Sequence, residues 1–286
     1  MKVSLVVPTR NELEGLRHYL PFLLQRRWHE VIVLDGGSTD GTPEYAASLG
    51  CKVVVQPDRG MRDAYLACCE VWSGDAIVVF SPDGNSLPEA LDVIITKLEQ
   101  GYDMVIASRY KDGARSYDDT LLSGFGNRFF TLTTACFGFP YSDAMVMYRG
   151  FRRDLPTKLG LDVRRSRPYE RTLGRYVSWE PLMSIRAAKA QLHIAEVGFD
   201  EPRRLDQQGA GLLLPATRIY HFRAGFACLV QLAAETVRWN WRLRDGSHTR
   251  HTRRFHWPPT TAVATPAIAA TPIRDERGAH REVSAK

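Results

Sequence analysis

The stretch VIVLDGGSTDGT, residues 31–42, carries the strongest fold signal in the chain. Its first four residues, Val31–Leu34, form an uninterrupted β-branched and aliphatic run, which is typical of a strand buried on both faces. An aspartate and three glycines, with Ser, Thr and a second Asp among them, follow at once and mark a tight turn. The stretch therefore predicts a buried strand of a parallel sheet that ends in a polar loop, where open α/β sheets bind their ligands.

Comparable strand candidates occur on both sides of this stretch and alternate with helix-like segments through the first hundred residues. Leucine and isoleucine recur every three or four positions in residues 13–23 and 91–98, as expected of helices packed on a sheet. The expected strands are Val3–Val7, Val31–Leu34, Lys52–Val55, Ala76–Phe80 and Met104–Ala107. Because this alternation is the pattern of βαβ units, we predict an α/β fold with a mostly parallel central sheet flanked by helices.

The second half of the chain predicts further helices and two short strands. We expect helices at Asp119–Gly138, Tyr169–Arg175, Glu180–Ala190 and Pro215–Arg244, and strands at Met145–Tyr148 and His193–Val197. The last helix is amphipathic, and its apolar face either packs on the domain or rests on a membrane. We assign residues 1–245 to one folded domain.

Beyond residue 245 the composition shifts to His, Arg, Thr, Pro and Ala, so we expect residues 246–286 to form a disordered, basic and proline-rich tail. The tail either contacts anionic lipid headgroups or is solvated. The 286-residue chain has 44% hydrophobic and 24% charged residues, which is the balance of a folded protein, and its net charge of +6 favours anionic partners. Its basic residues are scattered and match no recognition motif, which argues against nucleic acid.

The five cysteines show no metal-binding spacing, and we interpret them as reduced, buried thiols of a cytosolic protein. The first residues lack the features of a signal peptide, and no stretch of about 18 apolar residues predicts a transmembrane helix. We expect a cytoplasmic protein whose contact with a membrane, if it has one, is peripheral and on the inner face of the cytoplasmic membrane.

Five blocks near the strand ends resemble the family 2 glycosyltransferases of the GT-A fold, and most closely the dolichol-phosphate mannose synthase-like branch, across roughly residues 3–240. The blocks are PTRNE (8–12), LDGGSTDGT (34–42), FSPDGNSLPE (80–89), YDMVIASRY (102–110) and SDAMVMYR (142–149). They occur in the family's order at plausible spacings, which is a far more specific signal than one glycine motif. The resemblance implies an inverting transfer of a hexose-like sugar from a UDP- or GDP-sugar. The implied acceptor is a polyprenyl phosphate, or else a saccharide or lipid-linked glycan.

Asp35 lies at a strand end, where its carboxylate can accept the imide hydrogen of uracil or the N1 and amino hydrogens of guanine. The neighbouring glycines allow a tight turn and a close approach of the ligand, whereas Asp40 and Thr42 are more simply explained as the cap of the next helix. With the resemblance, the expected nucleotide-sugar-binding residues are Pro8, Thr9, Asn11, Glu12, Asp35, Gly36, Gly37, Arg59, Arg62, Arg203 and Arg204.

Four of these residues are arginines that the resemblance places near the diphosphate. Arg59 matches the basic residue that precedes a Gly-x-Gly in the family, and Arg62 stands where that motif has its second glycine. The Arg62 side chain either reaches phosphate or faces solvent. Arg203 and Arg204 follow the last expected strand, where they either close over the bound donor and exclude water or form a solvated charge run.

Asp83 is the remaining carboxylate of a metal-binding DxD pattern, in which a hard divalent cation bridges protein oxygens and the two phosphates. Ser81 replaces the first acid of that pattern, so a site for Mg²⁺ or Mn²⁺ depends on Asp83, with Asn85 as a further oxygen ligand, and on the substrate phosphates. The alternative for Asp83 is a structural turn. The alternative for the whole chain is a non-catalytic relative with a degenerate metal motif, which binds a nucleotide-sugar or a membrane partner.

The acceptor side is expected to include Arg109, Ser123, Asn127 and Arg128, which resemble residues that line an acceptor-phosphate groove. A guanidinium suits this role because its planar fork bonds two phosphate oxygens, although Arg128 is equally explained by surface ion pairing. The basic residue that the family carries four positions before the matching serine is Asp119 here, which speaks against a lipid phosphate.

Asp143 and Arg149 are the expected catalytic residues, and both lie in the SDAMVMYR block. A hydroxyl acceptor needs a carboxylate that removes its proton as the new bond forms, whereas a phosphate acceptor does not. Asp143 is therefore either a general base or a residue that orients Arg149 and the phosphate groove.

Overall fold

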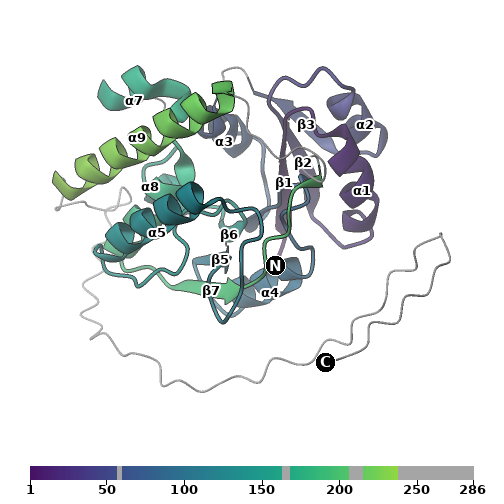
Figure 1. Cartoon of the computed structure of the whole chain (residues 1–286). Helices are drawn as coiled ribbons and strands as arrows, with labels where there is room; N and C mark the ends of the chain where they lie inside the picture. The colour runs from purple at the N-terminus through teal and green to yellow at the C-terminus, as the bar shows by residue number, and fades with distance from the viewer. Residues whose placement is uncertain (57–59, 163–167, 206–214, 238–286) are drawn as a thin grey trace, which may run out of the picture. The chain divides into compact units, whose positions relative to one another are not determined.

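The computed structural model describes residues 1–56, 60–162, 168–205 and 215–237. Within these residues, seven strands form one sheet in the order β3-β2-β1-β4-β6-β5-β7 (Figure 1). The strands are β1 (Val3–Thr9), β2 (Glu30–Asp35), β3 (Lys52–Val55), β4 (Ala76–Val79), β5 (Met104–Ser108), β6 (Arg149–Arg152) and β7 (Ile194–Gly198). All neighbours are parallel except that β6 runs antiparallel to both β4 and β5. The predicted α/β fold with a mostly parallel sheet is confirmed.

Helices cover both faces of the sheet (Figure 1). Alternate side chains of β1 enter two different cores, because successive residues of a strand point to opposite faces. One core packs against α1 (Leu13–Leu23), α2 (Thr42–Ser48) and α4 (Ala90–Glu99). The other packs against α3 (Met61–Cys69) and α8 (Trp179–Lys189), and α5 (Leu121–Ala135) and α9 (Pro215–Val237) lie against α8. The short helices are α6 (Leu155–Lys158), α7 (Pro168–Leu173) and the 3₁₀ turn η1 (Gly174–Tyr176).

Strand β6 and helix α3 differ from the sequence expectation. The strand expected at Met145–Tyr148 is wrong: these residues are irregular, and β6 begins at Arg149. The β6 sequence RGFR has no apolar run, so its strand conformation depends on backbone pairing with β4 on one side and β5 on the other. Helix α3 was not expected because residues on most of its sides are buried, which removes the polar face that makes a helix visible in a sequence.

Helices α1, α4, α5, α7, α8 and α9 and the other described strands lie within a few residues of their predicted positions. The short helix α6 was not predicted, and α2 was expected only as the helix that follows Asp40. Cys136 is exposed, contrary to the expectation that the thiols are buried, whereas Cys51, Cys68 and Cys228 are buried. No described helix is long and apolar enough to cross a membrane. The predicted tail, residues 246–286, and the predicted end of the last helix beyond Val237 lie outside the described residues.

Candidate active site

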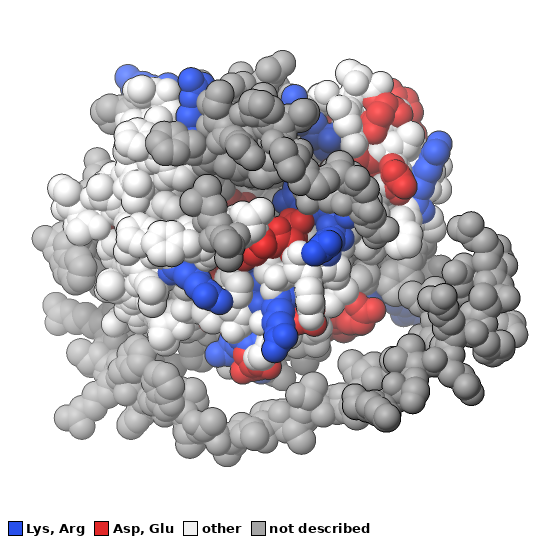
Figure 2. All heavy atoms as spheres, viewed as in Figure 1, with Lys and Arg blue, Asp and Glu red and all other residues white. Residues whose placement is uncertain are grey.

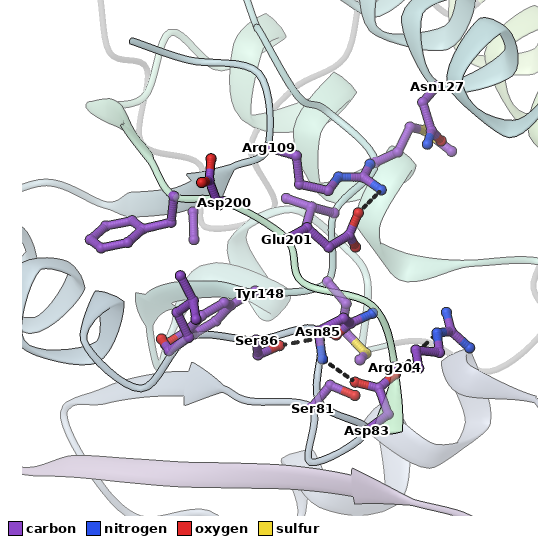
Figure 3. Close-up of a pocket in the computed structure, with 16 residues that line it drawn as sticks. Ser81, Asp83, Asn85, Ser86, Arg109, Asn127, Tyr148, Asp200, Glu201 and Arg204 are labelled. Carbon is purple, nitrogen blue, oxygen red and sulfur yellow. Dashed lines mark hydrogen bonds and ion pairs between the residues drawn. The ribbon is translucent and has the colours of Figure 1, made fainter. Parts of the chain in front are cut away.

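A pocket of about 260 Å³ opens at the edge of the sheet where the parallel strands end (Figure 3). Because β6 is antiparallel, the loop that precedes it reaches this same edge and lies beside the loops that follow β4, β5 and β7. Helix α5 contributes one further residue, Asn127. The pocket is lined by Ser81, Asp83, Asn85, Ser86, Leu87, Ala107, Arg109, Asn127, Met145, Val146, Met147, Tyr148, Phe199, Asp200, Glu201 and Arg204.

The loop after β4 presents Asp83 to this pocket and is held by the loop after β7. Gly84 has a φ of +97°, and a Cβ there would lie 2.9 Å from the Leu205 backbone nitrogen, so the two loops meet at a point where only glycine fits. The same Leu205 N–H donates to the Asp83 carbonyl at 2.8 Å. The Asp83 carboxylate accepts from the Asn85 N–H at 3.3 Å and lies 3.5 Å from Arg204 Nε.

The residues around Asp83 fit a hard divalent cation in part. Asp83 and Asn85 bring a carboxylate and an amide oxygen to one pocket, and oxygen ligands of this kind suit Mg²⁺ or Mn²⁺. Among the described residues no group of three or more His, Cys, Asp or Glu side chains could hold a metal. Mg²⁺ commonly binds through one or two carboxylates together with substrate phosphates. The protein thus offers part of a coordination shell that a diphosphate could complete.

Arg109, from the loop after β5, is the central cation of the pocket. Its Nε and Nη2 donate to the two oxygens of Asp143 at 2.6 and 3.0 Å, and its Nη1 lies 3.5 Å from a Glu201 oxygen. Burial opposes the charge, yet the adjacent Asp143 carboxylate raises the pKa of Arg109 above its ordinary value. Arg109 therefore joins the loop before β6 to the loop after β7, 58 residues further along the chain, with its charge shared between two carboxylates.

Asp143 and Arg149, the two residues predicted to be catalytic, do not line the pocket. The Asp143 side chain is completely buried, and Glu196 of β7 accepts hydrogen bonds from the Ser142 and Asp143 N–H groups. The Asp143 carboxylate binds Arg109, and no hydrogen bond joins it to Arg149 within the described residues. Arg149 lies in the core, where it donates to the Ala144 and Val146 carbonyls and to Ser184 Oγ, and burial lowers its pKa.

Two of the four residues predicted to hold an acceptor phosphate, Ser123 and Asn127, bind a carboxylate instead. Asp119 accepts hydrogen bonds from Tyr110 Oη, from Ser123 Oγ at 3.1 Å and from Asn127 Nδ2 at 3.1 Å. Asn127 lines the pocket, whereas Ser123 does not. Arg128 is exposed, and its guanidinium lies 6.0 Å from the centre of the Tyr110 ring.

Asp35, the predicted base-binding residue, uses its carboxylate to hold the turn that follows β2. The side chain is buried and accepts hydrogen bonds from the Gly37 and Ser38 N–H groups, both at 2.9 Å. Asn11 ties the loop after β1 to this turn, since its Oδ1 accepts from the Thr39 N–H at 2.9 Å. Asp35 and Asn11 therefore shape the surface of these two loops.

The two loops also start the helices that follow them. Asp40 accepts from the Thr42 and Leu13 N–H groups, and the Glu12 N–H donates to Thr42 Oγ1 at 3.1 Å. Asp40 thus binds the first N–H group of each helix, whereas the N-cap position of α2 is Gly41, which has no side chain to cap it. Pro8 and Thr9 form the end of β1, and the Gly36 N–H donates to the Thr9 carbonyl at 2.8 Å. None of the residues at 8–12 and 35–37 lines the pocket around Asp83.

The remaining predicted arginines lie in different surroundings. Arg62 is buried in α3, so the alternative that it faces solvent is wrong. Arg203 is exposed and donates to the Tyr117 carbonyl at 3.3 Å. Arg204 lines the pocket, with its Nε 3.2 Å from Asp118 and 3.5 Å from Asp83. Arg59 lies outside the described residues.

Glu201 and Asp200 are pocket residues that the sequence did not single out as site residues. The backbone of Glu201 forms a β-bridge with Ser116, and the Ser116 hydroxyl donates to its carboxylate. Burial raises the pKa of Glu201, with Asp118 and Asp119 acting in the same direction. In the view of Figure 2, acidic and basic side chains lie next to one another near the middle of the molecule. In the sequence, Glu201 belongs to the charged run DEPRR, which gives no sign that one member turns inward.

An open α/β sheet with a polar pocket at the carboxyl ends of its parallel strands is the arrangement of nucleotide-binding enzymes. Residues 4–160 match the family model "Glycosyl transferase family 2", which covers more than half of the chain. The chain belongs to glycosyl transferase family 2, as the five sequence blocks predicted.

Among curated relatives, glycosyltransferase AglJ of Haloferax volcanii is 35% identical over 155 residues, which are 53% of this chain and 50% of that protein. The dolichol-phosphate mannosyltransferase of Pyrococcus furiosus is 33% identical over 40% of this chain and 35% of its own length. The polyprenol monophosphomannose synthase of Mycolicibacterium smegmatis is 29% identical over 59% of this chain and 68% of its own length. The chain thus spans about half or less of the first two relatives.

Solved structures agree on the fold. The glucosyl-3-phosphoglycerate synthase of Mycobacterium tuberculosis, crystallised with Mn²⁺, UDP-glucose and glycerol 3-phosphate, superposes with a TM-score of 0.57. The two chains are 18% identical, and the match covers 82% of this chain and 79% of the other. At this identity the likeness establishes a shared GT-A-like fold.

Proposed function

We propose that the protein transfers a hexose-like group from a UDP- or GDP-sugar, with inversion at the anomeric carbon, to a polyprenyl phosphate or to a saccharide or lipid-linked glycan. The observation that carries the proposal is the convergence of Asp83, Asn85, Arg109 and Arg204 in one pocket at the carboxyl edge of the sheet. Family membership and the polyprenyl-phosphate sugar transferases among the relatives support it.

In this proposal the donor nucleotide lies on the loops after β1 and β2 and the diphosphate extends to Asp83. Pro8, Thr9, Asn11 and Glu12 form one side of the nucleotide site, and the turn at 35–37 forms the other. Asp35 acts here by holding that turn, because its carboxylate already accepts the Gly37 and Ser38 N–H groups.

The leaving diphosphate needs compensating positive charge beside Asp83. Asp83 and Asn85 would hold a Mg²⁺ or Mn²⁺, which would supply positive charge that offsets the charge developing on the leaving diphosphate. Arg204 is next to the same carboxylate and adds a cation from the loop after β7, with Arg203 beside it in sequence.

We also propose that the protein binds peripherally to the cytoplasmic face of an anionic membrane. On α5, Phe125, Phe129 and Leu132 are exposed at spacings of three or four residues and form one apolar stripe. Helix α9 lies against α5 and exposes Phe226 and Leu229. Exposed arginines at 128 and 223 belong to the same two helices and suit anionic headgroups.

A thermal-shift panel tests the central proposal, with UDP-glucose, UDP-galactose, UDP-N-acetylglucosamine, GDP-mannose and GDP-glucose, each with and without Mn²⁺. We expect at least one donor at about 100 Kd to stabilise the protein by about 2.7 kcal/mol, which corresponds to a rise in Tm of roughly 5–10 °C. Mn²⁺ should enlarge the shift. Asp83→Ala should lose the enlargement and the release of nucleoside diphosphate.

Asp92→Asn is the matched control, because it removes an exposed carboxylate on α4 that pairs with Arg26 away from the pocket. It should behave as the wild type. If no donor raises Tm, the proposed function is wrong. If a donor binds but is neither hydrolysed nor transferred, the chain is a non-catalytic nucleotide-sugar-binding relative.

A further inference from the structure

The acceptor side of the pocket is built from carboxylates rather than from free cations. Each of the two arginines that line the pocket forms ion pairs with two acids. Arg109 pairs with Asp143 and Glu201, and Arg204 pairs with Asp83 and Asp118. A phosphate acceptor would have to compete with these carboxylates for the guanidinium hydrogens. The cost of such competition is high for Arg109, because Asp143 is completely buried and would be left without its counter-charge.

Asp119 adds a second obstacle to a phosphate acceptor. Three polar groups that might bind phosphate oxygens, those of Tyr110, Ser123 and Asn127, all donate to the Asp119 carboxylate. Asn127 also lines the pocket, so this carboxylate lies directly behind the pocket wall. Its negative charge repels a phosphate, whereas the hydroxyl groups of a sugar or polyol can donate to the carboxylates of this region.

Glu201 is placed to act on such a hydroxyl. It lies on the pocket wall, and Figure 3 shows Glu201 and Arg109 on one side of the pocket, across from Asp83, Asn85 and Ser81. Its backbone is fixed on both sides, since its N–H donates to the Arg115 carbonyl and its carbonyl accepts from the Tyr117 N–H. The Glu201 side chain is only 11% exposed, and its carboxylate is oriented by Ser116 and Arg109.

Resting on the proposed function, we infer that the acceptor is a hydroxyl compound of the sugar or polyol class and that Glu201 is the general base that takes its proton. The acceptor oxygen forms a bond to the anomeric carbon while the bond from that carbon to the diphosphate breaks. The electron pair of the broken bond leaves with the diphosphate, and the hydroxyl proton passes to the Glu201 carboxylate. A phosphate acceptor would need no such base.

The surroundings of Glu201 agree with this role. Burial and the nearby Asp118 and Asp119 raise its pKa, which makes the carboxylate a better proton acceptor, while the Arg109 charge acts in the opposite direction. Of the other nearby acids, Asp143 is committed to Arg109, and Asp200 accepts the Arg115 N–H at 2.8 Å. Glu201 combines a place on the pocket wall with a raised pKa.

Glu201→Gln tests the inference, with the best donor from the thermal-shift panel and three acceptors: water, octyl glucoside and citronellyl phosphate. Water is the smallest hydroxyl acceptor, so release of nucleoside diphosphate gives a readout without the natural acceptor. We expect turnover with water or octyl glucoside, and a fall of roughly 10²- to 10⁴-fold in Glu201→Gln. Donor affinity should fall far less than turnover, because the proton transfer needs the carboxylate whereas the donor contacts of Asp83 and Asn85 remain.

The pH profile separates a base from a residue that merely supports the fold. Wild-type kcat/KM should fall towards acid pH as Glu201 becomes protonated, with the limb above the ordinary glutamate value of 4.5, and Glu201→Gln should lack this limb. Glu70→Gln, an identical change at an exposed position after α3, should match the wild type throughout.

The outcomes separate this inference from the proposed function. If no donor binds, the proposed function fails and the inference falls with it. If donors bind but sugar passes only to citronellyl phosphate, the proposed function stands and the inference is wrong. The inference is equally overturned if Glu201→Gln keeps wild-type turnover with hydroxyl acceptors, or if the bound donor reacts with none of the three acceptors.

Discussion

At the scale of single residues, the same side chain serves different purposes according to the groups around it. Arg109 and Arg149 are both nearly buried, yet Arg109 faces two carboxylates at the pocket while Arg149 donates to backbone carbonyls and a serine in the core. The pKa shifts follow these surroundings: the Asp143 charge raises that of Arg109, and burial lowers that of Arg149. Removing the acid partner of Arg109 would therefore disturb the pocket, whereas changing Arg149 would disturb the core.

Gly15 supports a stability prediction at this scale. A Cβ at Gly15 would lie 2.2 Å from the Pro82 carbonyl oxygen, so α1 approaches the loop of Asp83 more closely than any side chain allows. Gly15→Ala should lower the free energy of unfolding by about 1–3 kcal/mol through overpacking, and weaken donor binding by displacing that loop. Urea unfolding and the thermal shift measure the two effects.

Gly126→Ala is the matched control for Gly15→Ala. Gly126 lies inside α5, and its Cβ would meet nothing within 4 Å. The substitution should leave stability unchanged or raise it by up to about 1 kcal/mol, because alanine favours the helix. Equal destabilisation by the two changes would contradict the close approach of α1 to Pro82.

At the scale of elements, the sheet edge assembles the pocket because β6 is inserted antiparallel between β4 and β5. The insertion brings the loop at 142–148 beside the loops that follow the three strands β4, β5 and β7. Helix α9 is held against α8 by charged side chains. Arg186 of α8 lies 2.9 Å from Glu235 of α9, and both side chains are buried. Lys189 lies 3.4 Å from the same glutamate.

Glu235→Gln tests how far this buried cluster holds α9 against α8. The substitution removes the buried Glu235 charge from beside Arg186 and Lys189, and we expect a loss of about 3–5 kcal/mol in the free energy of unfolding. Asp154→Ala, which breaks the exposed Asp154–Lys158 pair, should cost less than about 1 kcal/mol. Urea denaturation of the full chain measures both. Similar losses for the two variants would show that the cluster is not effectively buried.

At the scale of the whole molecule, the distribution of exposed apolar side chains is the feature that bears on location. Phe125 and Leu132 of α5 are each 70% exposed, and α9 beside it exposes Phe226 and Leu229. Aromatic and aliphatic side chains in this setting can enter the interfacial region of a bilayer while exposed arginines bind its headgroups. The proposal of peripheral membrane contact therefore rests on exposed side chains of α5 and α9 and does not depend on the tail.

Vesicle flotation tests the membrane contact. The full chain should float with vesicles of phosphatidylcholine and phosphatidylserine and less with phosphatidylcholine alone, and added salt should weaken the binding. The double variant Phe125→Ser with Leu132→Ser should lower the partition coefficient at least about tenfold, because it removes two apolar side chains from the interface.

Phe22→Ser is the control for flotation, since Phe22 is an exposed phenylalanine on α1. It should partition like the wild type. Equal flotation of the double variant would contradict the assignment of the surface to α5. A wild-type chain that floats with neither vesicle would contradict membrane contact altogether.

The sequence alone determined the family, the order of most strands and helices, and the presence of Asp83, Asn85, Arg109 and Arg204 near strand ends. These properties depend on local patterns, such as an apolar run followed by aspartate and glycine, which are visible in the sequence itself. The sequence did not predict helix α3 or strand β6. Helix α3 is buried on most of its sides, so it has no exposed polar face, and the short strand RGFR depends on pairing with its neighbouring strands.

Only the tertiary structure decided which charges meet. Arg109, Asp143 and Glu201 are far apart in the chain, and nothing in their local sequences pairs the arginine with these two acids instead of with a phosphate. The turn role of the Asp35 carboxylate, the burial of Arg149 and the inward position of Glu201 have the same origin. A charged side chain is defined by its partners and its desolvation, and both arise when the loops of a folded sheet come together.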